Sequence, residues 1–217
     1  MIVLAMVIVE LFTSEGCSSC PPADALLAEL DKDANVLVLS EHVDYWNYLG
    51  WKDPFSSSEL TARQQRYARR FAKEGAYTPQ MVVDGQVQFV GSDKRLAKSA
   101  IAQAASAMKV PVTLARDGDR VRIDASALGL SSKPKSAELW VAVVRPEGSA
   151  AVPRGENAGR TLRHVGIVRS LTKVGSATRE AGVTHFVSLP APEGGAWRVV
   201  AFLQEPGQGP ILGGGRL

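Results

Sequence analysis

Glu15-Gly16-Cys17-Ser18-Ser19-Cys20-Pro21-Pro22 is the stretch on which the interpretation of this chain depends. It contains both of the cysteines present among the 217 residues. An apolar run from Ile2 to Phe12 precedes it, and an amphipathic segment from Ala23 to Leu30 follows it. Two thiols at C-x-x-C spacing, between a predicted strand and a predicted helix, indicate thiol–disulfide chemistry.

The position of the two cysteines predicts a different role for each sulfur. A helix start presents unpaired N–H groups and the positive end of the helix dipole, which stabilise a thiolate. We expect Cys17, on the turn before the helix, to be the exposed attacking sulfur. Cys20, one turn later, is expected to resolve the mixed disulfide that forms on Cys17.

Two other interpretations of the cysteine pair stay open. A structural disulfide is one, although so small a ring stabilises a fold by only about 2 kcal/mol in the loop-entropy relation. Half of a zinc site is the other, and it needs two further ligands. Besides carboxylates, only His42, His164 and His185 are available for that role.

Composition excludes several classes of protein. Hydrophobic residues make up 45% of the chain, which supports a real core and argues against disorder. The net charge is only +3 and the arginines of the basic second half are scattered, so no nucleic-acid partner is expected. The apolar run at the start is too short for a membrane span. It also lacks a basic region and a cleavage site, so we expect no export signal in this chain.

The first half reads as alternating strands and helices. Strands at 2–12 and 36–39 flank the helix at 23–30, a βαβ unit with parallel strands. The loop at 42–55 follows the second strand and holds five aromatic side chains. Ligands bind at the carboxyl ends of such strands, so we expect this loop to form a lid or substrate groove beside Cys17. Its candidate substrate-binding residues are Trp46 and Trp51. The alternative is a loop that packs its aromatic rings on its own core.

Two helices and a hairpin follow this loop. Ser56-x-x-Glu59 is a capping box and predicts a helix that ends at Gly75. Asp84-Gly85 is a type I′ turn signal and predicts a hairpin within 77–91. Ser92 is expected to cap the next helix.

This order of elements resembles the thioredoxin-like fold, especially its glutaredoxin-style core. In that family a proline with a cis peptide bond lies against the cysteine pair, and Thr78-Pro79 matches it in order and context. The resemblance implies a cis Thr78–Pro79 bond beside Cys17. It also implies that Thr78 and Pro79 hold the backbone of a bound substrate chain.

A narrower resemblance covers most of the chain. The segment 10–24 looks like the signature of a family of bacterial secreted proteins, domain of unknown function twelve-twenty-three, and 77–80, 154–160 and 203–204 extend the match. The resemblance implies an exported precursor and hence a periplasmic or secreted protein. The common thioredoxin site has tryptophan before the first cysteine and Gly-Pro between the two. Here Gly16 and Ser18-Ser19 occupy these places, which leaves open whether the protein oxidises or reduces.

The second half has a different pattern, with alternating strands and no helical period. We expect a boundary at Lys109 and a small all-β antiparallel sandwich domain over 110–217, after a thioredoxin-like α/β domain over 1–109. Gly213-Gly214-Gly215 is interpreted as a tail. The segment 154–164 gathers Arg, Glu, Asn and His side chains. It forms a polar site, a loop held by its own hydrogen bonds, or a loop that docks on the first half and shapes access to Cys17.

The sequence therefore predicts a thiol–disulfide oxidoreductase of the cell envelope. Cys17 is the nucleophile, Cys20 resolves, and the partner is a protein dithiol or disulfide. No cofactor, resident metal or membrane span is expected. The alternative function is a non-enzymatic binding module of the envelope, in which the cysteines are structural or hold a soft metal such as Cu(I).

Overall fold

The structure, a computed structural model, describes residues 6–129, 134–190 and 197–217. Its helices are α1 (Pro21–Leu30), the short 3₁₀ helix η1 (Asn47–Leu49), α2 (Ser58–Arg70) and α3 (Lys94–Ala105). Its strands are β1 (Val7–Thr13), β2 (Val36–His42), β3 (Gln80–Val83), β4 (Val87–Val90), β5 (Val112–Asp117), β6 (Arg120–Ala125), β7 (Ser136–Ala151), β8 (Thr161–Thr178), β9 (Val183–Ser188), β10 (Arg198–Gln204) and β11 (Ile211–Arg216).

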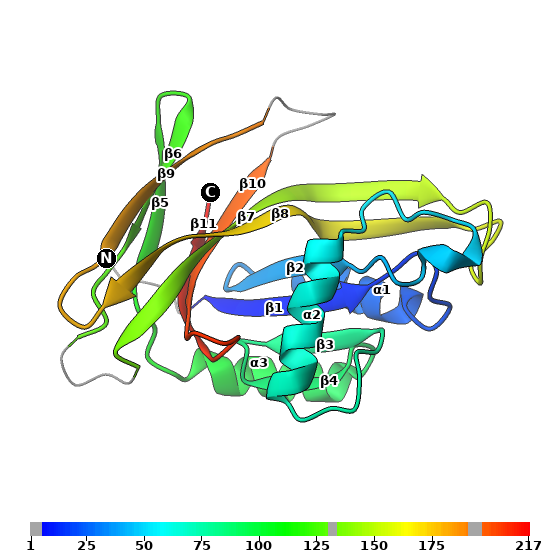
Figure 1. The fold of residues 1–217 in the computed structure, drawn as a ribbon, viewed down its shortest axis with the longest axis horizontal. Coiled ribbons are helices and arrows are strands. Elements are labelled where there is room, and N and C mark those ends of the chain that lie inside the picture. The colour runs from blue at the N-terminus through cyan, green and yellow to red at the C-terminus, as the bar shows by residue number, and fades with distance from the viewer. Residues whose placement is uncertain (1–5, 130–133, 191–196) are drawn as a thin grey trace.

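One mixed sheet runs through both halves of the chain. Its eight strands lie in the order β11-β10-β7-β8-β2-β1-β3-β4, and β5-β6-β9 form a second, three-stranded sheet. The strands β1 and β2 are parallel, as predicted, and β2 pairs in parallel with β8 through Ser40 and Ile167. The long β7–β8 hairpin crosses the molecule and ends near the start of α1 (Figure 1).

The predicted fold class is wrong in consequence. We expected a thioredoxin-like α/β domain followed by a separate all-β sandwich, but β7, β8, β10 and β11 extend the sheet that contains β1 and β2. The sequence pattern gives strand positions but not their partners, and long-range pairing of β2 with β8 leaves no local signal. The division of the chain between residues 109 and 110 stays a prediction.

The alternation of β1 explains how the helices cover the sheet. All seven residues of β1 are buried, which its valine and isoleucine content favours. Successive side chains of a strand point to opposite faces. Val7, Val9 and Leu11 pack in one core with residues of α1 and α3, whereas Ile8 packs in another with Leu60 of α2. The carboxyl end of β1 is thereby held at the position where the cysteines follow.

Several local predictions are confirmed and others shift by one residue. The hairpin β3–β4 turns at Asp84 and Gly85, both with positive φ, as a type I′ turn requires. Ser57 rather than Ser56 caps α2, and Asp93 rather than Ser92 caps α3. The helix α2 ends at Arg70, before the predicted stop. Of the strand predicted at 2–12, residues 2–5 lie outside the described part.

The glycine-rich end of the chain is a strand and not a tail. The strand β11 pairs with β10 and lies against the segment before β5, where the amide of Val110 donates to the carbonyl of Leu212 at 2.8 Å. A Cβ at Gly213 would lie 2.0 Å from the carbonyl oxygen of Val110. Glycine therefore permits the close approach of two backbones here. Because glycine has a low strand propensity, the sequence pattern did not predict this strand.

Candidate functional site

The two cysteines form a disulfide on the turn between β1 and α1. The amide of Cys20 donates to the carbonyl of Cys17 at 3.2 Å, and the hydroxyl of Ser19 lies 3.3 Å from the Cys17 sulfur. Pro21 and Pro22 occupy the first turn of α1. Cys17 is 1% exposed and Cys20 is 0% exposed. The expectation of an exposed Cys17 is therefore wrong, because side chains from the loop after β2 and from the tip of the β7–β8 hairpin cover the turn.

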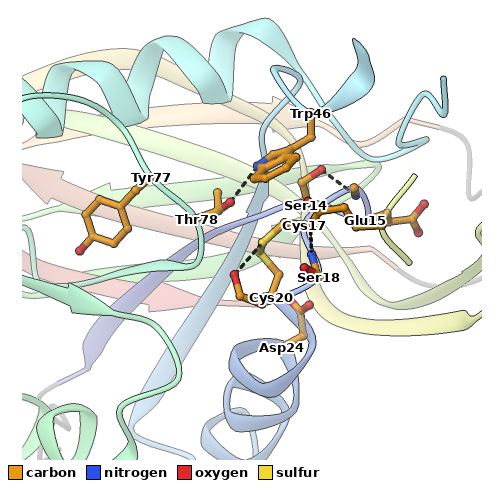
Figure 2. Close-up of a disulfide and its surroundings, with 12 residues drawn as sticks. Ser14, Glu15, Cys17, Ser18, Cys20, Asp24, Trp46, Tyr77 and Thr78 are labelled. Carbon is orange, nitrogen blue, oxygen red and sulfur yellow. Dashed lines mark hydrogen bonds between the residues drawn. A yellow bond between two sulfur atoms is a disulfide. The ribbon is translucent and has the colours of Figure 1, made fainter. Parts of the chain in front are cut away.

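Trp46, from the loop after β2, is one of these covering side chains. Its indole N–H donates to the hydroxyl of Thr78 at 2.8 Å, and the ring lies beside the disulfide (Figure 2). A Cβ at Gly16 would lie 2.8 Å from the Cβ of Trp46, so glycine before Cys17 makes room for the tryptophan. The peptide bond between Thr78 and Pro79 is cis, as the resemblance implied.

A second tryptophan of the same loop fixes a buried carboxylate. Trp51 donates from its indole nitrogen to Glu15 Oε2 at 2.7 Å, and Glu15 is fully buried. The Oδ2 atom of Asp53 accepts a hydrogen bond from the Glu15 amide at 2.9 Å. The Nδ1 atom of His42 lies 2.7 Å from the same Oδ2 atom. Burial opposes ionisation of Asp53, but the charge and hydrogen bond of His42 and the backbone amides lower its pKa. The predicted lid thus contacts the cysteine turn at both Trp46 and Trp51.

The tip of the β7–β8 hairpin supplies the third cover. The buried side-chain amide of Asn157 donates to the carbonyls of Glu15 and Cys17, each at 2.9 Å. Glu156 accepts the amide of Ser18 at 2.9 Å, and Arg160 donates to the Asn157 Oδ1 atom at 2.9 Å. The contacts confirm that the segment 154–164 docks near Cys17, and they show that the loop is also held by its own hydrogen bonds.

A buried histidine lies between two buried carboxylates next to this turn. His164 of β8 is 2% exposed, its Nε2 atom is 3.6 Å from Glu15 Oε1, and its Nδ1 atom is 3.6 Å from Asp24 Oδ1. Its ring meets that of His42 edge-on, with centroids 4.5 Å apart. Burial opposes the imidazolium charge, but Asp24 and Glu15 outweigh it and raise the pKa of His164 to about 9.

This charge arrangement predicts a pH dependence of stability. A raised pKa in the folded state means that the His164 proton stabilises the fold fully below its unfolded value of about 6.5. That contribution is lost as pH rises through about 9. In the wild type, the free energy of unfolding should therefore decline by an amount on the order of 2 kcal/mol between about pH 6.5 and about pH 9. We expect His164→Gln to remove this decline, as measured by urea unfolding. His185→Gln is the matched control and should keep the decline. Parallel curves for the two variants would contradict the assignment.

The structure brings together most of the residues that the sequence singled out. Cys17, Cys20, Trp46 and Thr78 gather at one place, and Trp51 reaches the turn through Glu15. The sequence pattern did not identify Glu15 or Asp24 as parts of the site, and it identified Asn157 only as one of the polar residues of the segment 154–164. The first two flank the cysteines, and this proximity was an available signal. Among the residues that the structure describes, no three His, Cys, Asp or Glu side chains form a metal-binding group.

The fold and the site together define a class: a protein with one extended mixed sheet and a covered C-x-x-C disulfide at a strand-to-helix turn. The model of the family described as "Protein of unknown function (DUF1223)" matches residues 8–204, so the chain belongs to this family. No curated protein matches the chain. In the described parts of the chain, no helix has the length and apolarity that crossing a membrane requires.

Two solved structures are similar over nearly the whole chain. A crystal structure of a protein from Agrobacterium tumefaciens is 30% identical, with a TM-score of 0.80, over 98% of this chain and 94% of that one. The structure of HBP35 of Porphyromonas gingivalis is 15% identical, with a TM-score of 0.63, over 98% of this chain and 74% of that one. At this identity the second likeness shows the fold alone.

Proposed function

We propose that the protein is a thiol–disulfide oxidoreductase of the cell envelope that acts on protein dithiols or disulfides. The observation that carries the proposal is the disulfide between Cys17 and Cys20, which side chains of the loop after β2 and of the β7–β8 hairpin tip cover. A disulfide persists in an oxidising compartment, which supports a periplasmic or secreted location. So small a ring contributes little stability, which also favours chemistry over a structural role.

The exchange balances without a cofactor. A substrate thiolate attacks the Cys17 sulfur, the Cys17–Cys20 bond breaks, and a mixed disulfide forms while the Cys20 sulfur gains a proton. A second thiolate of the substrate then attacks the substrate sulfur of the mixed disulfide and releases Cys17 as a thiolate. The substrate loses two electrons and the protein gains them. Reversal of these steps reduces a substrate disulfide.

The burial of both sulfurs favours one other function. A pair that is 1% and 0% exposed also suits a binding module in which the disulfide is structural. Equilibration with glutathione buffers separates the two. A reversible potential of roughly −270 to −120 mV supports exchange, whereas a pair that resists reduction below about −300 mV overturns it. Stoichiometric metal on the reduced protein would instead support a soft-metal module.

A further prediction concerns how Trp46 limits the access of a reductant to Cys17. Trp46→Phe keeps an aromatic ring but removes the indole hydrogen bond to Thr78. A hydrogen bond of this kind contributes about 1 kcal/mol. If that bond holds the cover closed, reduction of the disulfide by dithiothreitol should become about fivefold faster. Tyr48→Phe is the control, because Tyr48 on the same loop is 77% exposed. Equal rates for both variants would show that Trp46 does not limit access.

A further inference from the structure

The cover over the cysteine pair has to open before a protein substrate can react. Cys17 is 1% exposed, so the sulfur of another protein reaches it only after part of the cover moves. The cover has two parts. One is the loop after β2, which includes Trp46, and the other is the hairpin tip, residues 152–160 between β7 and β8. The part that moves controls access to Cys17.

The loop after β2 is bound to the body of the protein at several points. The amide of Asp44 donates to the hydroxyl of Thr61 on α2 at 3.0 Å, and this hydroxyl donates to the Asp44 carboxylate at 2.6 Å. Trp46 packs against a buried aromatic core and donates to Thr78. Opening the loop would break these bonds and expose apolar surface, so we expect this part of the cover to stay in place.

The hairpin tip is held by fewer contacts, and its polar contacts lie on the backbone of the cysteine turn. Asn157 donates to the carbonyls of Glu15 and Cys17, and Glu156 accepts the amide of Ser18. Within the tip only Asn157 and Val152 are buried. The tip also closes on itself through backbone hydrogen bonds, so it can leave the turn without unfolding. It is therefore the part of the cover that opens at the lower cost.

Reduction changes the charge of the turn on which the tip is docked. A donor dithiol gives up two electrons and becomes a disulfide, and the Cys17–Cys20 bond breaks. Cys17 leaves as a thiolate, and one proton of the donor passes to Cys20. The position of Cys17 before the start of α1 stabilises the thiolate. The disulfide form of the turn has no such charge.

The new charge forms close to a carboxylate of the tip. Four covalent bonds separate the Ser18 nitrogen from the Cys17 sulfur, so the Glu156 oxygen bonded to that nitrogen lies within about 7 Å of the sulfur. The hydrogen bonds from Ser18 lower the pKa of Glu156, which keeps it ionised. Two negative charges closer than one Debye length repel each other. The other carboxylates beside the turn, Glu15 and Asp24, face His164, which compensates their charge.

We infer that the hairpin tip is a redox-sensitive latch, docked on the disulfide form of the turn and released by the charge of the Cys17 thiolate. The inference rests on the proposed function and concerns the regulation of the same site. The released tip uncovers Cys17 in the form that attacks a substrate disulfide. When Cys20 displaces the substrate and the Cys17–Cys20 bond forms again, the charge is gone and the tip docks. Contacts made only with the disulfide form stabilise that form by the same amount.

Equilibration with glutathione tests whether the tip contacts differ between the two redox states. Asn157→Ala removes contacts that the latch makes only with the disulfide form. At a fixed ratio of reduced to oxidised glutathione, the ratio of dithiol to disulfide protein should therefore rise about tenfold. A tip docked equally in both states would leave this ratio unchanged, and that result overturns the latch. Glu147→Gln, at an exposed position of β7, is the control and should leave the ratio unchanged.

Alkylation of the reduced protein by iodoacetamide tests the role of the charge. Glu156→Gln keeps an oxygen that accepts the Ser18 amide but removes the negative charge, so the tip should stay docked on the reduced turn. The rate of Cys17 alkylation, expressed per thiolate, should then fall about tenfold below that of the wild type. Asn157→Ala, whose tip is free in both states, should react at the wild-type rate. A Glu156→Gln rate equal to that of the wild type contradicts release by charge and overturns the latch.

Two controls separate the latch from a folding defect and from failure of the proposed function. Near-ultraviolet circular dichroism checks each variant, and Glu156 is exposed, so Glu156→Gln carries the test if Asn157→Ala does not fold. A pair that resists reduction by glutathione overturns the exchange function, whereas alkylation after reduction by dithiothreitol still decides the latch. If dithiothreitol does not reduce the pair either, both proposals fail.

Discussion

Replacing Arg63 with methionine is expected to lower the free energy of unfolding by about 4 kcal/mol at neutral pH. Arg63 of α2 is 1% exposed; its Nε atom donates to Glu10 Oε1 at 2.6 Å and lies 3.5 Å from Glu41 Oε1. Both glutamates are fully buried. Without the guanidinium, the fold holds carboxylates with no compensating charge, and this cost exceeds the value of the lost hydrogen bonds.

The pH dependence identifies the cause of that loss. Burial, with the nearby charge of Glu10, raises the pKa of Glu41 well above its usual value, although Arg63 opposes this. The fold is therefore favoured below the unfolded pKa of about 4.3, and this contribution is lost as pH rises through the folded value. Removal of Arg63 strengthens the effect. Urea unfolding gives the free energy of unfolding of Arg63→Met and of the wild type. The difference between the two free energies should shrink as pH falls toward about 4.3, the pKa of a glutamate in the unfolded chain.

The control is Arg66→Met, on the same helix but in partial contact with solvent. Its effect should stay within about 0.5 kcal/mol, as for most surface substitutions. If Arg63→Met and Arg66→Met destabilise the protein equally, or if the loss at Arg63 is independent of pH, the buried charges are not its cause.

Replacing Asn157 with alanine is the second large effect, with an expected loss of about 3 kcal/mol. Asn157 is fully buried, and its one amide group donates to the carbonyls of Glu15 and Cys17. Its removal leaves two buried acceptors without donors. Asn157→Asp keeps the shape but places a carboxylate against both carbonyls, so it should destabilise at least as much.

Two measurements check the Asn157 prediction. Urea unfolding gives the stability, and the rate of reduction by dithiothreitol should rise because the hairpin tip no longer holds the Cys17 turn. Asn35→Ala, at an exposed position, should change the stability by less than about 0.5 kcal/mol. A stable Asn157→Ala protein with unchanged reduction would show that the hairpin tip covers the site without holding it.

The local features of the fold could be predicted because they depend on neighbours in the sequence. The spacing of Leu26, Leu27 and Leu30 predicted α1, and Asp84-Gly85 predicted its hairpin. Sheet order depends instead on partners far apart, such as Ser40 and Ile167. The pattern of alternating strands in the second half is the same for a separate sandwich and for an extension of the first sheet. The fold class was therefore wrong although most elements were placed correctly.

The candidate site divides in the same way. C-x-x-C spacing identified Cys17 and Cys20, and the aromatic content of the loop after β2 identified Trp46 and Trp51. Asn157 was only one of several polar residues in its segment. Its hydrogen-bond partners depend on where the β7–β8 hairpin places it, and the sequence pattern does not give the length and course of that hairpin. The burial of Cys17 could not be predicted either, because Trp46 and Asn157 lie 29 and 140 residues away from it in the sequence.

The separation between the cysteines and the hairpin tip also sets an order of events during biosynthesis. Ser18 and its partner Glu156 are 138 residues apart. At a synthesis rate of about 5–20 residues per second, the ribosome makes the cysteine turn roughly 7 to 28 seconds before the segment that covers it. Throughout that interval the nascent chain presents both thiols without Asn157 or His164. Both thiols are therefore easiest for an oxidant to reach before the hairpin folds over them.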